Sequence, residues 1–447
     1  MLLAVLLLVV VIALLAGVHW YVWRRLVRDV TVRGSLARRA GTTAIVVLPL
    51  LSFAALAAGR AGVPFTLQRI LAWPGFLWLA LLLYVVLALL VGEAVRPLLR
   101  RALERRAATR APAAPAPETP ADPVPAGAAL DAGTRTDPAA VPGPADTLAD
   151  TSAEAPSAAS PSAASPSAAS PSAVSRRLFV SRIVGGTAVA AAAGTVGYGS
   201  YGVLRGPRVK RVTVPLAKLG RAAHGYRIAV VSDIHLGPIL GRAHTQRIVD
   251  TINATQPDLV AVVGDLVDGS VADLGPAAEP LAQLQARHGS FFVTGNHEYF
   301  SGATEWVDHV RELGLRPLQN ERVEMPGFDL AGVNDPAGET ENDGPDFGAA
   351  LGDRDRTRTS VLLAHQPIVI DEAVRHGVDL QLSGHTHGGQ LWPGNYLAEL
   401  ANPTVAGLER YGDTQLYVSR GAGAWGPPVR VGAPSDITLV QLASRQA

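Results

Sequence analysis

The first quarter of the chain consists of long apolar runs separated by short polar connections. Three runs, at residues 2–23, 42–58 and 70–91, contain no charged side chain, and His19 is the strongest polar interruption of the first. A helix rises roughly 1.5 Å per residue, so these runs approach the roughly 30 Å hydrocarbon core of a bilayer. The pattern predicts three membrane-spanning helices within residues 1–106, with a buried core helix as the alternative for any single run.

The placement of arginine predicts the orientation of these helices. Arginines crowd the connections after the first and third runs, whereas the connection between the second and third runs holds only Arg60 and Arg69. Cytoplasmic loops of membrane proteins retain arginine and lysine. We therefore expect the N-terminus outside and the end of the third helix inside. The first run lacks a basic leader and an A-x-A exit, which indicates an anchor rather than a cleaved signal.

Residues 107–175 change to an alanine, proline, serine and threonine composition, and four tandem P-S-A-x-S copies occupy residues 156–175. Such a segment buries too little apolar surface to offset the entropy of ordering it. It is expected to be a disordered linker without a catalytic role.

A fourth apolar run, Ile183 to Leu204, follows the sequence S-R-R-L-F-V-S at residues 175–181. Residues 176–206 resemble a twin-arginine export signal placed inside the chain, and an ordinary fourth membrane helix is the alternative. In both interpretations the chain crosses the membrane from inside to outside. Arg176, Arg177 and Arg182 before the run favour this direction, whereas the basic residues at 205–211 after it oppose it. The expected location is the cytoplasmic membrane, crossed several times, with the C-terminal domain outside.

From Val212 onward, short β-branched runs alternate with helical patterns. Strands are expected at 227–232, 259–263, 291–294, 361–364, 380–383, 416–419 and 437–442, helices at 244–254, 281–287, 304–313 and 368–376, and a hairpin-like stretch before Val333. The alternation predicts an α/β domain over residues 212–447 with parallel strands, whose ligands bind beyond the carboxyl ends of the strands.

Polar residues gather where five of these strands end. The sets are Asp233-Ile-His235, Gly264-Asp265, Gly295-Asn296-His297-Glu298, His365 and Gly384-His385-Thr386-His387. One such coincidence would mean little, but five strand ends together identify a site. The three glycines fit sharp turns that leave the strands, where a positive φ or a close backbone approach is often required.

Composition narrows the chemistry of this site. The formal net charge of +1 on 447 residues gives no case for a nucleic-acid partner, since the arginines gather beside the apolar runs. The chain contains no cysteine, which excludes disulfides, thiolate metal sites and thiol nucleophiles. The histidines outside the strand ends, at 19, 224, 244, 288, 309 and 376, are interpreted as ordinary surface or core residues.

The strand-end residues follow the order D-x-H, G-D, G-N-H-[DE], H and G-H-x-H. In this order the chain resembles the calcineurin-like metallophosphoesterases from about Tyr226 to Leu442, with Glu298 in place of the commoner aspartate. The resemblance implies a four-layer α/β/β/α sandwich. The H-T-H-G-G-Q sequence at 385–390 and the S-R-G-x-G…P-x-R sequence at 419–430 look like a membrane-associated bacterial branch, which includes enzymes acting on phosphodiester or pyrophosphate bonds of lipid-linked molecules.

The resemblance also implies a role for each residue. One metal ion would be bound by Asp233, His235 and His387, the other by Asn296, His365 and His385, and Asp265 would bridge the two. His297 would protonate or stabilise the leaving oxygen, with Glu298 orienting it and Asp268 also placed outside the ligand set.

Such a ligand set favours particular ions and a particular reaction. Imidazole and oxygen ligands without thiolate favour manganese, iron or zinc over calcium or magnesium alone. Two divalent ions against two aspartates and a shared hydroxide leave about +1 of charge to attract a phosphate. The expected function is hydrolysis of a phosphodiester or pyrophosphate, with a lipid-linked substrate as one candidate. A phosphomonoesterase or protein phosphatase could use the same residues, and a non-enzymatic membrane sensor would require a degraded metal site.

Two segments are candidates for selecting the substrate. Residues 334–358 are acidic, glycine-rich and long enough to form a lid, or else a mobile solvated loop. Residues 391–411 follow the metal-binding turn and carry Trp392, Leu397, Leu400 and Leu408. Exposed, these side chains could enter the headgroup region of a membrane; buried, they would cover the sheet.

Overall fold

A computed structural model of the chain describes residues 2–110 and 171–446. The chain divides into two compact units, one made of Met1–Pro97 with Leu178–Ala447 and the other of Leu98–Arg177. In the second unit the structure describes only the end of one helix and the start of the next. The linker expected at 107–175 lies largely outside the described residues, and the first unit contains the folded domain and the candidate site.

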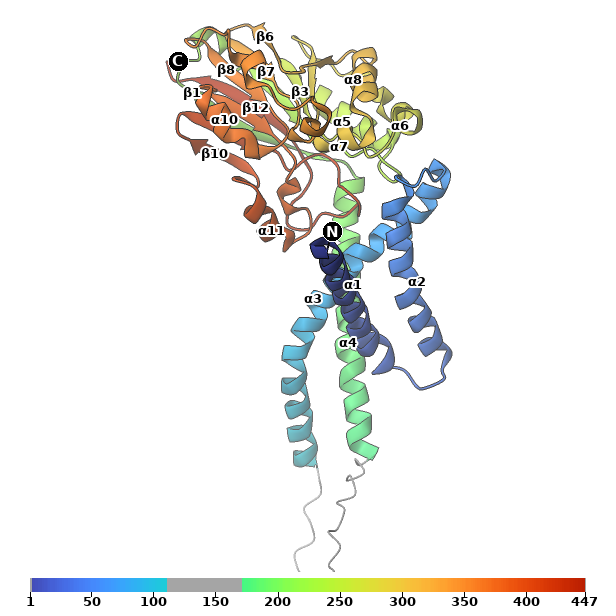
Figure 1. Ribbon diagram of the computed structural model, residues 1–447. Helices are drawn as coiled ribbons and strands as arrows, with labels where there is room; N and C mark the ends of the chain where they lie inside the picture. Colours follow the sequence, from blue (N-terminus) through green and yellow to red (C-terminus); the bar gives the residue numbers. More distant parts are fainter. Residues whose placement is uncertain (1, 111–170, 447) are drawn as a thin grey trace, which may run out of the picture. The chain divides into compact units, whose positions relative to one another are not determined.

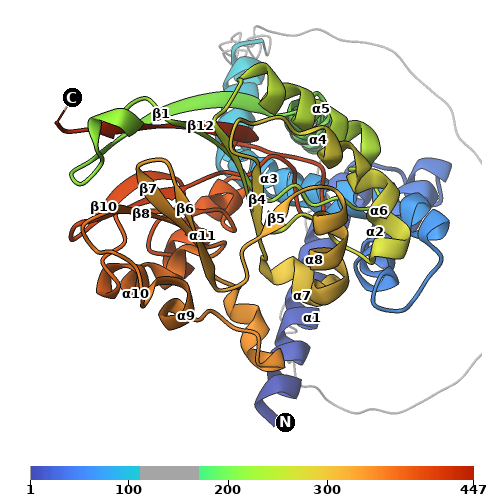
Figure 2. The same ribbon diagram turned by 90° about the horizontal axis from the view of Figure 1, so that it is seen from above.

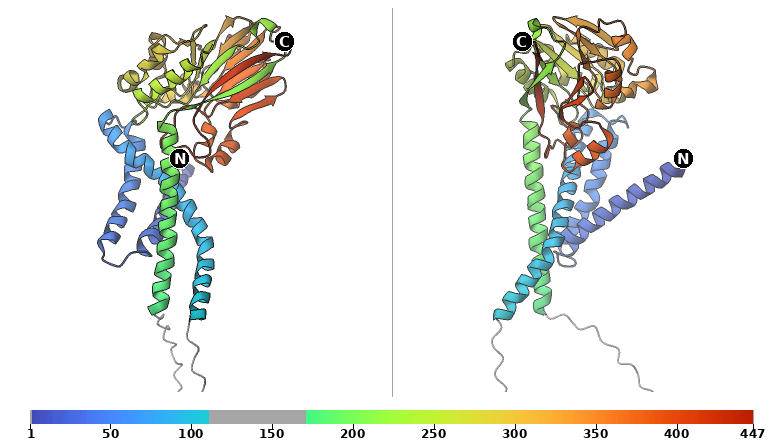
Figure 3. Two further views of the ribbon diagram at one scale, coloured as in Figure 1. Left: turned by 180° about the vertical axis from the view of Figure 1, so that it is seen from behind. Right: turned by 90° about the vertical axis from the view of Figure 1, so that its left-hand side faces the viewer.

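Four long helices carry the apolar runs (Figure 1). They are α1 (Leu2–Trp23), α2 (Leu36–Ala58), α3 (Phe65–Arg110) and α4 (Pro171–Leu204). Each contains a stretch long and apolar enough to cross a membrane. Helix α2 begins earlier than expected because the Ser35 hydroxyl accepts a hydrogen bond from the backbone N–H of Arg38. Helix α3 contains Pro74 and Pro97 and bends along its length (Figure 3).

Side chains of these helices divide into a packed and an exposed set. Large apolar side chains such as Leu14 of α1 and Phe53 of α2 are exposed, as suits a surface that faces lipid. Helices α1, α3 and α4 pack through Val22, Leu89 and Ala192. Helix α4 is continuous from Pro171, so the twin-arginine-like stretch belongs to the same helix as the fourth apolar run.

Two six-stranded sheets form the C-terminal domain, with strand orders β1-β12-β2-β3-β4-β5 and β10-β11-β9-β8-β7-β6. The strands are β1 (Arg208–Leu216), β2 (Arg227–Val231), β3 (Leu259–Val263), β4 (Ser290–Val293), β5 (Arg316–Pro317), β6 (Glu321–Met325), β7 (Phe328–Gly332), β8 (Thr359–Leu363), β9 (Leu380–Ser383), β10 (Gly407–Tyr411), β11 (Thr414–Val418) and β12 (Asp436–Ser444). Most neighbouring strands are parallel, but β12 with β2, β10 with β11 and β6 with β7 are antiparallel.

Helices cover the outer face of each sheet, so the domain has the expected four layers (Figure 2). The covering helices are α5 (Arg242–Ala254), α6 (Val271–Ala278) and α8 (Ala303–Glu312) on the first sheet, and α9 (Phe347–Leu351) and α10 (Ile370–Arg375) on the second. Two further helices, α7 (Asn296–Ser301) and α11 (Gly394–Ala401), contribute no residue to these two covering cores. Strand β3 shows how the layers are joined, because its alternate side chains point to opposite faces. Leu259 and Val263 belong to the core between the sheets, whereas Val260 and Val262 pack beneath α5, α6 and α8.

Several sequence-based expectations differ from the fold. The first sheet begins at Arg208, because β1 pairs with β12 along its whole length, so the boundary expected at 212 is too late. The hairpin-like stretch expected before Val333 is the antiparallel pair of β6 and β7. The other two antiparallel pairs, β12 with β2 and β10 with β11, depart from the expected parallel arrangement. The helix expected at 281–287 is a 3-10 turn, Glu279–Gln283, which ends where Leu284 adopts an extended conformation. Helix α6 precedes this turn and was not expected.

Candidate metal centre

The candidate residues leave their strands with an unusual backbone conformation. Positive φ angles between 48° and 72° occur at Asp233, His235, Asp265, His385 and His387. Residues other than glycine rarely adopt this region, at a cost on the order of 1 kcal/mol or more each. Strands β2, β3 and β9 therefore end in sharp turns. At Gly264, where φ is 73°, a Cβ atom would also meet the His365 ring at 2.6 Å, so glycine is required on both counts.

The first group of candidate ligands consists of Asp233, His235 and His387. Each offers one ligand atom, and these atoms lie within 4.8 Å of one another. The Nε2 atoms of His235 and His387 face each other at 3.0 Å, and His387 Nε2 lies 3.3 Å from Asp233 Oδ1. His235 Nδ1 donates a hydrogen bond of 2.9 Å to Asp268, which leaves its Nε2 lone pair free for a cation.

The second group consists of Asp265, His365 and His385, with Asn296 beside them. The ligand atoms of the first three also lie within 4.8 Å of one another, and His385 Nδ1 is 3.0 Å from Asn296 Oδ1. His365 Nδ1 donates to the Val263 carbonyl at 2.9 Å. Its Nε2 therefore points into the centre, where Asp265 is its neighbour.

Asp265 connects the two groups. Its Oδ2 lies 3.1 Å from His365 Nε2 and 3.7 Å from His235 Nε2. Burial opposes the charge of Asp265, but His365 and His235 hold its pKa well below the usual range, whereas burial raises the pKa of Asp233. Buried carboxylates, free imidazole nitrogens and an amide oxygen converge here without a thiolate. This donor set fits divalent cations such as manganese, iron or zinc.

His297 stands beside the first group without joining either group. Its Nδ1 lies 2.7 Å from Asp268 Oδ1, so one carboxylate accepts from both His297 and His235. Burial opposes the Asp268 charge, but these two imidazoles lower its pKa to about 2. The backbone N–H of His297 also donates to Asp265 Oδ1 at 2.9 Å. With Nδ1 occupied, Nε2 is the His297 atom that can contact a substrate.

Glu298 is completely buried and does a different job from the one expected. Its carboxylate accepts backbone N–H bonds from Asp265 at 3.0 Å, Leu266 at 2.8 Å and Gly295 at 2.6 Å. Burial and the Asp265 charge raise the Glu298 pKa to about 7, against the effect of these bonds. Glu298 thus fixes the turn that carries Asp265, and it is Asp268 that contacts the His297 ring.

Arg430 supports His387 from within the domain, a contact that sequence reasoning missed. The Arg430 guanidinium donates to the His387 carbonyl at 3.0 Å and lies 3.0 Å from its Nδ1. Burial, His235 and Arg430 hold the His387 pKa well below its usual value. His387 is therefore neutral, which is the form that binds cations. The only sign of this Arg430 contact in the sequence was the P-x-R ending of the 419–430 stretch.

Asp335 is a further buried carboxylate near this centre. It follows strand β7, accepts a hydrogen bond from Gln366 at 2.9 Å, and is only 1% exposed. Burial raises its pKa. Asp335 lies in the stretch expected to be a lid or a mobile loop, and part of that stretch is packed into the domain. Residues 334–358 contain α9, whose Phe347 and Leu351 pack into the core beneath the second sheet.

Exposed aromatic side chains surround His297. Phe300 and Trp425 have ring centroids 5.5 Å and 5.8 Å from the His297 ring, and they are 64% and 55% exposed. Gln390 holds Trp425 in place, because its side chain accepts from the Trp425 N–H at 3.0 Å and donates to the Trp425 carbonyl at 2.9 Å. A substrate that reaches His297 must therefore pass apolar rings.

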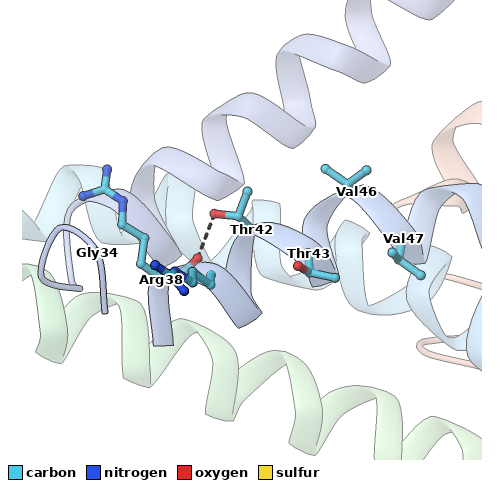
Figure 4. A pocket seen from close by; sticks show the side chains of 7 residues that line it. Gly34, Arg38, Thr42, Thr43, Val46 and Val47 are labelled. Carbon is cyan, nitrogen blue, oxygen red and sulfur yellow. Dashed lines mark hydrogen bonds between the residues drawn. The ribbon is translucent and has the colours of Figure 1, made fainter. Parts of the chain in front are cut away.

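A separate hollow of about 490 Å³ lies along α2, far in sequence from the metal-ligand residues (Figure 4). Gly34, Arg38, Arg39, Thr42, Thr43, Val46 and Val47 line it. The Thr42 hydroxyl donates to the Arg38 carbonyl at 2.8 Å and is thereby occupied within the helix. The lining contains no carboxylate or imidazole, so this hollow does not supply metal ligands.

Comparisons with known proteins agree with this geometry. Residues 226–389 match the family model described as calcineurin-like phosphoesterase. An uncharacterized metallophosphoesterase of Aquifex aeolicus is 34% identical over 249 residues, which are 53% of this chain and 92% of that protein. A zebrafish (Danio rerio) transmembrane protein with metallophosphoesterase domain is 39% identical over 259 residues, 55% of this chain and 59% of that protein.

An uncharacterized metallophosphoesterase of Helicobacter pylori strain J99 is 38% identical over 247 residues, 55% of this chain and 66% of that protein. The chain thus spans less than two thirds of the length of the zebrafish and Helicobacter relatives. The region that this chain shares with each of the three relatives has the size of one domain.

Proposed function

Since the chain belongs to the calcineurin-like metallophosphoesterase family and carries helices that associate it with a membrane, we propose that it hydrolyses phosphodiester or pyrophosphate bonds at a centre of two divalent ions. The observation that carries the proposal is the pair of ligand groups that share Asp265. In this proposal Asp233, His235 and His387 hold one ion. Asn296, His365 and His385 hold the other, and Asp265 touches both.

The residues of the chain divide the work of hydrolysis. When bound, the two ions would supply an activated water and neutralise charge on the phosphate. The side chains of both groups would hold the ions at the end of the strands, and hydrolysis would need no covalent bond to the enzyme. His297, whose Nδ1 is occupied by Asp268, presents Nε2 to the leaving oxygen and donates a proton to it. Asp268, whose carboxylate stays ionised at neutral pH, holds the His297 ring through Nδ1.

The proposed location is a membrane crossed by all four long helices. Four crossings return the chain to the side of its N-terminus, and the arginine-rich connection after α1 places that side outside the cytoplasm. The catalytic domain would then lie outside. A lipid-linked phosphate is the favoured substrate, because exposed aromatic rings flank His297 and membrane helices are part of the same chain.

The proposal is tested with purified full-length protein and two chromogenic substrates. With manganese present, we expect bis(p-nitrophenyl) phosphate to be hydrolysed more efficiently than p-nitrophenyl phosphate, as measured by kcat/KM. Exhaustive chelation should reduce both activities by at least about 1,000-fold, and manganese, iron or zinc should restore them. Full diester activity after chelation would refute the metal mechanism, whereas faster monoester hydrolysis would assign the site to a phosphomonoesterase.

A further inference from the structure

Helix α11 presents an apolar face that nothing in the described structure covers. None of its residues is buried, and Tyr396, Leu397 and Leu400 are 58%, 72% and 85% exposed. At roughly 100° per residue these three side chains fall on one side of the helix, with Glu399 at the edge of that side. Trp392, just before the helix, is also exposed. Contiguous exposed apolar side chains of this size mark an interaction surface.

The helix is tied closely to the metal-binding turn. A Cβ atom on Gly389 would collide with the backbone of Asn395, and one on Gly394 would meet the Gly389 carbonyl at 2.7 Å. The backbone N–H of Gly394 donates to the Leu391 carbonyl at 2.7 Å. No side chain fits between the turn and α11, so the helix cannot move independently of His387.

The same segment rests on the membrane helices. The Tyr84 hydroxyl of α3 donates to the Trp392 carbonyl at 3.0 Å. Leu391 packs in one cluster with Val196 of α4 and Val85 of α3. Tyr84 belongs to the apolar run at 70–91, which is long enough to cross a bilayer. The start of α11 is therefore held against a helix whose apolar run is long enough to cross a bilayer.

A second contact between the domain and α4 strengthens this placement. The backbone N–H of Arg430 donates to the Gly199 carbonyl at 3.4 Å. A Cβ atom on Gly199 would meet Val429 at 2.7 Å, so the two segments are packed backbone to backbone. Arg430 also holds His387, which means that α4, the metal-binding turn and α11 form one packed region.

We propose that α11 and Trp392 form a membrane-docking surface, which inserts Trp392, Tyr396, Leu397 and Leu400 into the bilayer that α3 and α4 cross. A helix with one apolar face and a polar edge lies in the plane of the headgroups with its apolar side toward the acyl chains. The occupant is a lipid bilayer rather than a protein, because the surface is continuous with helices that are themselves apolar enough to be surrounded by lipid.

Docking explains how a lipid-linked phosphate would reach the metal centre, and in this respect it rests on the proposed function. Gln390 joins the docked turn to Trp425, whose ring lies 5.8 Å from His297. The apolar surface therefore runs from α11 to the side chain that faces the leaving group. A substrate anchored in the bilayer could present its phosphate without leaving the membrane.

The absence of cysteine makes this surface directly measurable. The full-length protein is labelled with an environment-sensitive fluorophore at one introduced cysteine and reconstituted in phosphatidylcholine–phosphatidylglycerol nanodiscs. The single variants are Leu397→Cys, Leu400→Cys, Glu399→Cys and Asp353→Cys. Lipids with a quencher near the headgroup should quench labels at 397 and 400 at least about threefold more than the label at 353. The label at 399, at the polar edge of the same helix, should give an intermediate value. Equal quenching at 397, 399 and 353 would overturn docking.

A second measurement separates docking from catalysis. The variant Leu397→Glu/Leu400→Glu should hydrolyse the water-soluble bis(p-nitrophenyl) phosphate within about twofold of wild type, because neither residue touches the ligand groups. A label at Tyr396→Cys in that variant should lose most of its lipid quenching, and full retention would also overturn docking. Quenching requires no turnover, so failure of the diester assay in the wild type would refute the proposed function and leave the docking result standing.

Discussion

The two sheets make unequal contributions to the metal centre. Strands β2, β3 and β4 of the first sheet deliver the candidate oxygen ligands and one candidate imidazole ligand, namely Asp233, His235, Asp265 and Asn296. Strands β8 and β9 of the second sheet deliver imidazoles alone, namely His365, His385 and His387. Each ligand group combines members of both sheets. Neither sheet by itself could bind the two metal ions. The packing between the sheets therefore sets the geometry of the site.

The hydrophobic core between the sheets supports the candidate metal ligands. Val263, at the end of β3, and Leu382, one residue before the end of β9, belong to this core. The seven candidate ligands lie two to four residues beyond the ends of their strands, and five of them have a positive φ. Bound ions would clamp the two sheets together and offset the repulsion between Asp233 and Asp265. Catalysis and stability should therefore respond together when either sheet loses a ligand.

The largest effect is expected from removing one ligand on each sheet. Asp265→Ala and His387→Ala should each lower kcat for bis(p-nitrophenyl) phosphate by at least about 1,000-fold at saturating manganese, because the reaction needs a complete centre. Asp265→Ala should remove both ions, since that carboxylate touches both groups, whereas His387→Ala should keep one. If either variant kept a tenth of the wild-type activity, the reaction would not require ligands from both sheets.

His297 offers a sharper test, because it lies on α7 directly after a strand of the first sheet and is proposed to donate a proton rather than to bind an ion. His297→Ala should lower kcat by about 100-fold, the usual size of a general-acid contribution, while the metal content stays unchanged. The loss should be larger for a diester with an alkyl leaving group, which needs the proton more. His309→Ala, on α8, serves as the control and should behave as wild type. Loss of metal from His297→Ala would instead make it a ligand.

A smaller effect is expected on stability. Ions that bind only the folded domain at about 100 times their Kd add about 2.7 kcal/mol. For a domain of this size that corresponds to an increase of roughly 5–10 °C in the unfolding midpoint, measured by fluorescence with and without manganese. Asp265→Ala should lose this increase. An unchanged midpoint in the wild type would show that the sheets hold the ligands without help from the ions.

The sequence predicted the strand-end residues well, because a parallel strand places its carboxyl end at one edge of a sheet regardless of the rest of the chain. All five strand ends come together in the structure. The layers and the four apolar helices were also predictable, from strand–helix alternation, the family resemblance and run length. The remaining histidines stay outside the ligand groups, among them His244, which is buried in α5.

Contacts made by tertiary packing could not be predicted in the same way. The family resemblance implied that Glu298 orients His297, but Glu298 turns inward to three backbone N–H groups, and Asp268 contacts the His297 ring instead. Arg430 lies 43 residues from His387 in sequence and Asp335 lies 31 residues from Gln366, and only the folded chain brings these pairs together. Short helices such as α11 have too few residues to show a reliable period.

The central claim is a two-ion centre divided between two sheets, and the most direct test is the metal content of the protein. Full-length protein reconstituted with manganese, iron or zinc and freed of excess ion should hold two ions per chain by mass spectrometry. His387→Ala should hold one, and Asp265→Ala none. A fully active wild-type protein with a single ion, or with no ion, would contradict the account.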